Sequence, residues 1–322
     1  MPKFYNPCAE YVPQNTGMYG LYEKIEKAGR CCYKSEGKTE YDEEGKSITA
    51  EMFAKKLLNV FKHLSVAEHA NIYLKYQLWD SPRMTYQENA FFNFYDKNPY
   101  SRVNSVDGYL YITTNLRVLI ENEREDDLKY MCDPTNWHDI RHTIRVFTDR
   151  GVSAEANRHR VDSPSERSTR YVNYGHDDAV SINIPTDFTE DQIEEREQIW
   201  AAAGIKDSSF FNMCSQIVDE FDQDDWDVLD YWLFSIYATE FSYMNLLRLG
   251  WKPQQARRVL TLSTQTELYI TAYEDDWVKF IGQRYFGTTG TPHPDMKELT
   301  GKIIKEFEQI ESITNKVNLL YR

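Results

Sequence analysis

The order of helical and strand-like patterns along the chain constrains its fold more than any other feature. Apolar residues recur at helical spacing over most of the 322 residues, whereas alternating patterns typical of strands are few. The patterns predict helices over 18–30, 49–62, 110–121, 136–149, 189–204, 208–249, 253–262, 274–284 and 295–317, strands over 70–79 and 179–184, and a loop over 92–109. Because regular strand–helix–strand alternation is missing, we expect an α+β fold rather than a doubly wound α/β fold.

Charge and composition narrow the class of protein. The formal charge of −14 argues against general nucleic-acid binding, because phosphate contacts need clustered Lys and Arg. No apolar run approaches the roughly 18 residues of a membrane helix, and the N-terminus lacks the apolar core of a signal peptide. The five cysteines form no C-x-x-C pair, as expected of reduced thiols. We therefore expect a cytoplasmic protein with neither a membrane nor a nucleic-acid partner.

The stretch from Arg158 to Tyr171 stands out against this acidic background. It holds four Arg and one His within fourteen residues, together with three Ser, one Thr and Glu166. Arg presents a planar fork of donors that matches phosphate, and a carboxylate can accept from sugar hydroxyls or base N–H groups. Composition alone also allows a solvated charged surface with internal Arg–Glu pairs.

The order of these residues favours a binding site. Arg158-His159-Arg160, seven residues, Ser168 and then Arg170-Tyr171 resemble the signature of flavin-dependent thymidylate synthases, with the family's Glu present as Glu166. Three further segments occur in the family's order: Ala28 to Tyr33, His63 to His69, and Ala256 to Leu260, followed by Arg284 at the family's spacing.

The resemblance implies an enzyme that makes dTMP from dUMP. Methylenetetrahydrofolate would donate the carbon and NADPH would be the reductant, with FAD between them. The family implies mixed helices around a central, largely antiparallel sheet, in one catalytic domain over 1–322, and a homotetramer with shared active sites. The ranges 77–135 and 187–240 would be helical insertions around a shorter family core.

Residue roles follow from the resemblance position by position. It assigns substrate binding to Glu155, Arg158, Glu166, Ser168, Thr169, Arg170, Arg257 and Arg284. It assigns cofactor binding to His69, Asn71, Arg158, His159, Arg160, Glu166, Tyr273 and Lys279. Arg284 and Ser168 would be catalytic, and the Arg284 guanidinium would stabilise negative charge developing on the uracil ring. The reduced flavin would supply the hydride.

The chain departs from the family pattern near one end of the expected flavin site. Family members commonly carry Asn and Arg in the helix around 273–279, where this chain has Tyr273, Asp275 and Lys279. A carboxylate at Asp275 would oppose a phosphate contact there. The same scaffold could therefore serve a related flavin- or folate-dependent modification of a pyrimidine nucleotide, or a dUMP-binding regulatory protein without turnover.

Two other patterns suggest metals only weakly. His138-Asp139-Ile140-Arg141-His142 resembles a zinc-protease motif if the segment is helical, but its Asp is one methylene shorter than the usual Glu and no clear third ligand follows. The acidic run from Asp219 to Asp227 lacks the Gly and the terminal Glu of a calcium loop. We expect no metal site, and read the first as part of an amphipathic helix and the second as a solvated surface.

Overall fold

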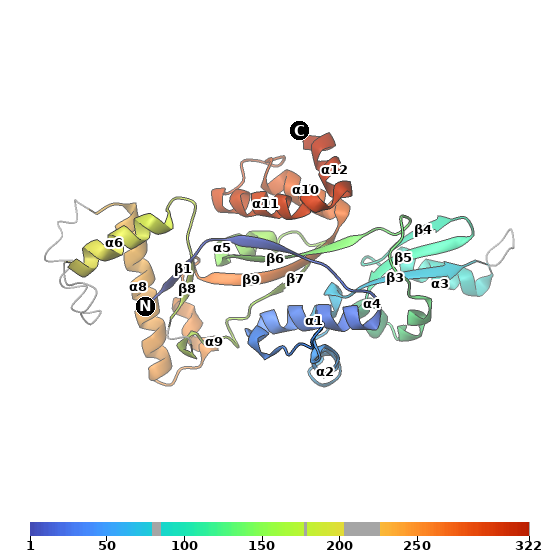
Figure 1. Cartoon of the computed structure of the whole chain (residues 1–322), viewed down its shortest axis with the longest axis horizontal. Helices are drawn as coiled ribbons and strands as arrows, with labels where there is room; N and C mark the ends of the chain where they lie inside the picture. Colours follow the sequence, from blue (N-terminus) through green and yellow to red (C-terminus); the bar gives the residue numbers. More distant parts are fainter. Residues whose placement is uncertain (79–84, 177–178, 203–225, 322) are drawn as a thin grey trace.

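A four-stranded antiparallel sheet forms the centre of the protein. The structure is a computed structural model that describes residues 1–78, 85–176, 179–202 and 226–321. The sheet order is β2 (Cys8–Val12), β6 (Arg141–Asp149), β9 (Gln265–Tyr273) and β7 (Ser163–Glu166). Figure 1 shows α10 (Glu274–Arg284), α11 (Pro294–Glu306) and α12 (Glu311–Tyr321) on one side of this sheet and α1 (Gly17–Tyr33) on the other. The α+β fold with a central antiparallel sheet is confirmed.

Strand β9 is buried along its whole length because it has neighbours on both edges and layers on both faces. One face carries Leu268 and Ile270, which join the apolar cluster beneath α10 and α11. The opposite face carries polar residues that are paired inside the protein. Thr271 Oγ1 lies 2.8 Å from His69 Nδ1, and the fully buried Glu267 forms an ion pair with Arg145 at 2.6 Å. Polar pairing therefore replaces apolar packing on half of this strand.

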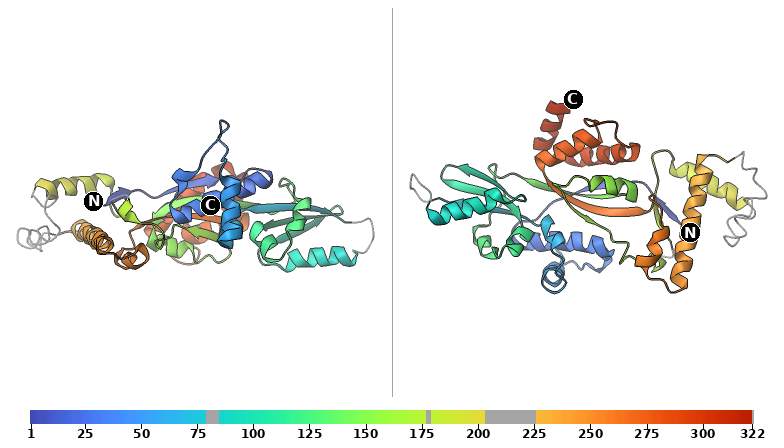
Figure 2. Two further views of the ribbon diagram at one scale, coloured as in Figure 1. Left: turned by 90° about the horizontal axis from the view of Figure 1, so that it is seen from below. Right: turned by 180° about the vertical axis from the view of Figure 1, so that it is seen from behind.

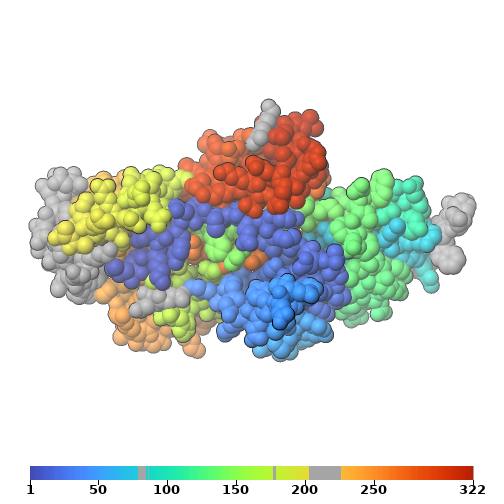
Figure 3. Space-filling model, in the orientation of Figure 1, coloured from blue at the N-terminus to red at the C-terminus, as the bar shows by residue number. Residues whose placement is uncertain are grey.

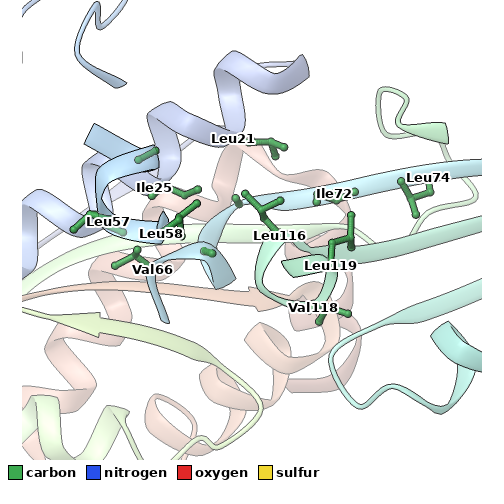
Figure 4. Close-up of a cluster of buried hydrophobic side chains, with 14 of the residues drawn as sticks. Leu21, Ile25, Leu57, Leu58, Val66, Ile72, Leu74, Leu116, Val118 and Leu119 are labelled. Atoms are coloured by element: carbon green, nitrogen blue, oxygen red, sulfur yellow. The ribbon is translucent and has the colours of Figure 1, made fainter. Parts of the chain in front are cut away.

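A second antiparallel sheet lies at one end of the molecule, in the order β3 (Asn71–Gln77), β5 (Tyr109–Asn115) and β4 (Arg102–Val106). It packs with α3 (Tyr86–Lys97) and α4 (Leu116–Glu121). Figure 4 shows Ile72 and Leu74 of β3 beside Leu116, Val118 and Leu119. The same apolar cluster continues to α1 and α2 (Ala50–Lys55), whose chain runs on as a π-helical turn over Lys56–Val60.

The opposite end is formed by α6 (Glu190–Ala202), α8 (Val228–Arg248) and the short α9 (Pro253–Ala256). They pack near a parallel pair of strands, β1 (Lys3–Tyr5) and β8 (Ser181–Asn183). Figures 2 and 3 show the resulting elongated molecule, in which the two ends flank the central sheet and its C-terminal helices. None of the described helices is both long enough and apolar enough to cross a membrane.

Several sequence-based expectations about local structure are wrong. The segment 136–149 is not a helix: it holds β6, and the helix α5 (Arg150–Ala156) begins only after it. Thr143, Ile144, Val146 and Thr148 are β-branched, and such side chains favour strands. Ile140 and Ile144 are also four residues apart, a spacing that favours the prediction of a helix.

Other boundaries also differ from the prediction. The expected loop over 92–109 contains the end of α3 and strand β4, and the expected helix over 110–121 is mostly β5 before it becomes α4. The helix expected over 253–262 is only α9 and a 3-10 turn at Arg257–Val259. The last predicted helix divides into α11 and α12.

Candidate functional site

The Arg-rich stretch runs from the end of α5 through β7 to the turn that follows it. Asp149 accepts a hydrogen bond from the Val152 amide at 2.7 Å and so begins α5. The chain then passes through Arg158, His159 and Arg160 and enters β7, which pairs with β9. Ser168 follows β7, and its amide donates to the Cys32 carbonyl at 3.1 Å. The two ends of one short strand therefore carry the two halves of the motif.

Arg284, at the end of α10, is held by two residues of the α5 segment. Its Nη1 donates to Glu155 Oε2 at 3.1 Å, and its Nη2 donates to the Glu155 carbonyl oxygen at 2.9 Å. Its Nε donates to His159 Nε2 at 3.0 Å, which requires that nitrogen to be unprotonated. Burial and the Arg284 charge lower the pKa of His159 to about 4, so the ring is neutral near pH 7. The structure thus unites three residues that the sequence had assigned separately to substrate and cofactor.

A second group surrounds Ser168. Arg257 Nη1 donates to Thr169 Oγ1 at 3.2 Å, and the Arg170 amide donates to Ser168 Oγ at 3.2 Å. The hydroxyls and guanidinium groups of this turn come from 168–170 and from the turn after α9. We call Ser168, Thr169, Arg170 and Arg257 the Ser168 group.

Four arginines of the predicted site have no acidic partner among the residues that the structure describes. All four are exposed. Within the described ranges, which contain most of the Asp and Glu of this acidic chain, no carboxylate forms an ion pair with Arg158, Arg160, Arg170 or Arg257. Exposed cations that a protein leaves unpaired are available to an anionic ligand.

The Glu166 carboxylate already accepts hydrogen bonds from residues of its own chain. Its Oε1 accepts from Ser153 Oγ at 2.9 Å, from Thr266 Oγ1 at 2.9 Å and from Arg150 Nη1 at 3.0 Å. Arg150 also donates to the Arg167 carbonyl at 2.8 Å. Glu166 therefore ties β7 to α5 and β9, and Arg150 is a positioning residue that the sequence reasoning missed, since it lies before the recognisable motif.

Four residues that the resemblance assigns to the flavin make their contacts apart from the Arg158-His159-Arg160 segment. His69 is fully buried, and burial together with the Arg141 charge lowers its pKa to about 3. Asn71 is buried beside it, and its side-chain oxygen accepts from Arg141 Nη1 at 3.0 Å. The Tyr273 ring lies 3.9 Å from the Arg102 guanidinium, and its hydroxyl donates to the Thr113 carbonyl at 3.2 Å. The fourth, exposed Lys279, lies 3.2 Å from Asp276. None of these contacts involves Arg158, His159 or Arg160.

The structure brings together three other aromatic residues from three separate motif segments. Tyr33 Oη lies 2.5 Å from His63 Nδ1, and the Tyr33 and Tyr171 ring centroids are 5.2 Å apart. Tyr171 is exposed, while Tyr33 and His63 are half-buried. The sequence reasoning missed this aromatic trio, although Tyr33, His63 and Tyr171 all belong to quoted segments. Its position beside Arg170 makes it part of the candidate site.

The zinc-protease reading is not supported by this geometry. His138 precedes β6, and its Nε2 lies 3.1 Å from the Leu74 carbonyl oxygen, whereas His142 on β6 lies 3.1 Å from Tyr11 Oη. The segment is not helical, so the two rings do not share a helix face. Among the described residues, no cluster of His, Cys, Asp or Glu could hold a metal ion. The acidic run from Asp219 lies outside the described residues except for Trp226 and Asp227.

Comparison with known proteins identifies one family. The model of the family described as thymidylate synthase complementing protein (Thy1) matches residues 136–311, more than half of the chain. No curated protein sequence gives a significant match.

Solved structures show a weaker similarity. The UMP/dUMP methylase PolB from Streptomyces cacaoi, bound with 5-Br dUMP, is 13% identical with a TM-score of 0.41, and the alignment covers 99% of this chain and 97% of that one. Thymidylate Synthase X from Helicobacter pylori, with FAD and dUMP, is 13% identical with a TM-score of 0.39, and the alignment covers 97% and 99%. Scores this low do not establish a common fold, so the assignment rests on the family model.

Proposed function

Because this chain belongs to the thymidylate synthase complementing protein family, we propose that it is a flavin-dependent thymidylate synthase. It would methylate dUMP reductively to dTMP, with methylenetetrahydrofolate as carbon donor, NADPH as reductant and FAD as cofactor. The observation that carries this proposal is the pair of exposed arginines beside Ser168 and Thr169, Arg170 and Arg257, with which no described carboxylate forms an ion pair in a chain of charge −14. A nucleotide phosphate matches these donors.

In this proposal the Ser168 group binds the phosphate, and Arg284 acts on the uracil ring. Glu155 and the neutral His159 hold the Arg284 guanidinium in one orientation through three hydrogen bonds. A guanidinium fixed beforehand can stabilise negative charge on the ring oxygen without reorganising during the reaction. The described cysteines with resolved shifts have raised pKa values through burial, so none is an activated nucleophile.

The fit to FAD is uneven among the residues first assigned to it. Arg158 and Arg160 are exposed and suit the pyrophosphate, whereas His69, Asn71 and Tyr273 are buried and hydrogen-bonded within the protomer. The aromatic trio offers partly exposed ring faces instead, so we expect His63 rather than His69 to face the flavin ring. When bound, the flavin would carry hydride from the reductant to the nucleotide.

The proposed assembly is a homotetramer with shared sites. Arg284 lies on the face of the central sheet covered by α10, whereas Ser168 meets the end of α1 on the other face (Figure 1). Within the described part of the chain, no hydrogen bond or ion pair joins Arg284, Glu155 or His159 to the Ser168 group. A second copy could supply the missing half of each site.

Spectra and product analysis test the function. The purified protein reconstituted with FAD should be yellow, and when given methylenetetrahydrofolate and NADPH it should convert dUMP to a product in which a methyl group replaces one ring hydrogen. UMP should be assayed in parallel to define the preferred nucleotide. Tight dUMP binding without flavin reduction would instead identify a regulatory protein, and failure to bind both FAD and dUMP would refute the proposal.

A further inference from the structure

One arginine of the Arg-rich stretch differs from the others in its burial. Of the four arginines between positions 158 and 171, three are exposed, whereas Arg167 is only 7% exposed. Its side chain forms an ion pair with Glu267 of β9, which is fully buried. A guanidinium that is buried against a carboxylate is not available to a phosphate at the surface. Arg167 therefore has a different role from the exposed arginines around it.

Arg167 shares Glu267 with a second arginine. Glu267 Oε1 accepts from Arg145 Nε at 2.6 Å, and Glu267 Oε2 accepts from Arg167 Nη2. The centroid of the Phe147 ring lies 4.7 Å from the Arg145 guanidinium and 5.9 Å from that of Arg167. Glu36 Oε1 lies 3.9 Å from Arg167 Nη2. Arg145, Glu267 and Arg167, which we call the Glu267 triad, thus join β6 and β9 to the end of β7.

The backbone of Arg167 is held at the same place as its side chain. Its amide donates to the Glu267 carbonyl oxygen at 2.8 Å, and its own carbonyl oxygen accepts from Arg150 Nη2 at 2.8 Å. The next residue is Ser168, whose carbonyl oxygen accepts from the Tyr171 amide at 3.2 Å, so the turn begins directly after Arg167. Because both the side chain and the amide of Arg167 bind Glu267, they fix the direction in which the chain enters this turn.

We propose that Arg167 is a positioning residue of the nucleotide site, acting through the turn at Ser168 rather than by contact with the ligand. The inference rests on the proposed function, and it goes beyond the family resemblance because the signature does not specify the residue at this position. A buried ion pair often adds little net stability over packed apolar side chains, but it holds its two charged groups in one arrangement. Loss of the pair lets the turn adopt other arrangements and weakens phosphate binding even where the fold is kept.

The Glu267 triad contains its own matched control. Arg167→Met and Arg145→Met each remove one arginine from the same carboxylate, but only Arg167 adjoins the turn. Isothermal titration of the full chain with dUMP should give a Kd about tenfold above wild type for Arg167→Met and within about twofold of wild type for Arg145→Met. Deoxyuridine, which lacks the phosphate, should bind all three proteins equally. Urea unfolding should show that both variants are less stable than wild type, because each leaves Glu267 with one partner fewer.

A double variant separates positioning from stability. Arg167→Met combined with Glu267→Met removes the ion pair without leaving a buried carboxylate, and Arg145 keeps Glu10 as a partner at 3.4 Å. Its unfolding midpoint should return towards that of wild type, whereas its dUMP Kd should stay about tenfold above wild type. This variant also carries the test if Arg167→Met does not fold. Arg167→Lys, which retains the charge, should bind dUMP more tightly than Arg167→Met.

Amide hydrogen exchange reports on the turn without any nucleotide. The amides of Tyr171 and Val172 donate to the Ser168 carbonyl oxygen at 3.2 and 2.9 Å, and they should exchange faster in Arg167→Met than in wild type or Arg145→Met. If wild type does not bind dUMP, the proposed function fails, and this exchange still decides whether Arg167 holds the turn. The inference is overturned if the exchange is unchanged in Arg167→Met, if that variant binds dUMP like wild type, if Arg145→Met loses as much affinity, or if the double variant regains affinity together with stability.

Discussion

Replacing Arg257 by Ala should weaken dUMP binding by about tenfold. Arg257 is exposed, and its only described side-chain hydrogen bond is the 3.2 Å contact to Thr169 Oγ1, so its remaining donors are free for a phosphate. A hydrogen bond to a charged group contributes about 1.5–3 kcal/mol. Because water screens an exposed guanidinium, the lower end of that range applies. About 1.5 kcal/mol corresponds to about a tenfold change in Kd.

The neighbouring Arg258 supplies a matched control. It is exposed on the same 3-10 turn and has no assigned contact with the nucleotide. Isothermal titration should give a dUMP Kd about tenfold higher for Arg257→Ala than for wild type, and an unchanged value for Arg258→Ala. Deoxyuridine, which lacks the phosphate, should bind all three proteins equally. The difference in dUMP Kd between Arg257→Ala and wild type should become smaller as salt is added, because salt screens the charge of the guanidinium.

The reasoning is refuted by either of two results. Equal losses of dUMP affinity in Arg257→Ala and Arg258→Ala would mean that only the general positive charge matters. Loss of deoxyuridine affinity in Arg257→Ala would mean that the guanidinium supports the local structure rather than the phosphate.

Three further predictions concern stability, each measured by urea unfolding. The pKa of His69 is lowered to about 3 in the folded protein, so between about pH 6.5 and 3 the unfolded chain binds a proton that the folded chain does not. The free energy of unfolding should therefore fall as the pH drops through this range, and it should fall less steeply in His69→Gln. Equal slopes for the two proteins would contradict this prediction. Leu119→Ala, at a fully buried position, should lower the free energy of unfolding by about 2–5 kcal/mol, whereas Leu319→Ala, at a position that is 86% exposed, should lower it by less than about 0.5 kcal/mol. Similar losses in the two variants would disprove the assigned core. Tyr273→Phe should cost about 1–2 kcal/mol, because the hydrogen bonds from its hydroxyl to the Thr113 and Tyr100 carbonyls are lost. An unchanged unfolding midpoint would exclude that role.

The Arg-rich motif was predictable because the residues that define it lie close together in the sequence. Ser168, Arg170 and Glu166 occur at fixed spacing within one segment, and the structure places that segment along the central sheet. The contact between Arg284 and Glu155 joins residues 129 positions apart, and it could be anticipated only through the family resemblance. The fold class was also predictable, since the scarcity of strand–helix alternation is visible in the sequence.

The central strands were not predictable from periodicity. Strand β9 carries Glu267 and Thr271 on a buried face, where cross-strand partners satisfy them, so the sequence lacks the alternation of a half-buried strand. His69 shows the same limit at the site. The motif alone does not predict that His69 is buried against β9, where it contacts Thr271. It also does not predict that His63, six positions earlier, is half-buried and hydrogen-bonded to Tyr33.

The placement of Arg284 and Ser168 on different faces of one sheet has a genetic consequence. If each nucleotide draws Arg284 from one copy and Ser168 from another, two defective genes can rescue each other. Chains carrying Arg284→Ala and chains carrying Ser168→Ala would each be inactive alone, yet co-expression would create mixed assemblies in which some sites receive both intact residues. Growth of a thymidine-requiring host on both alleles, but on neither alone, is the expected outcome.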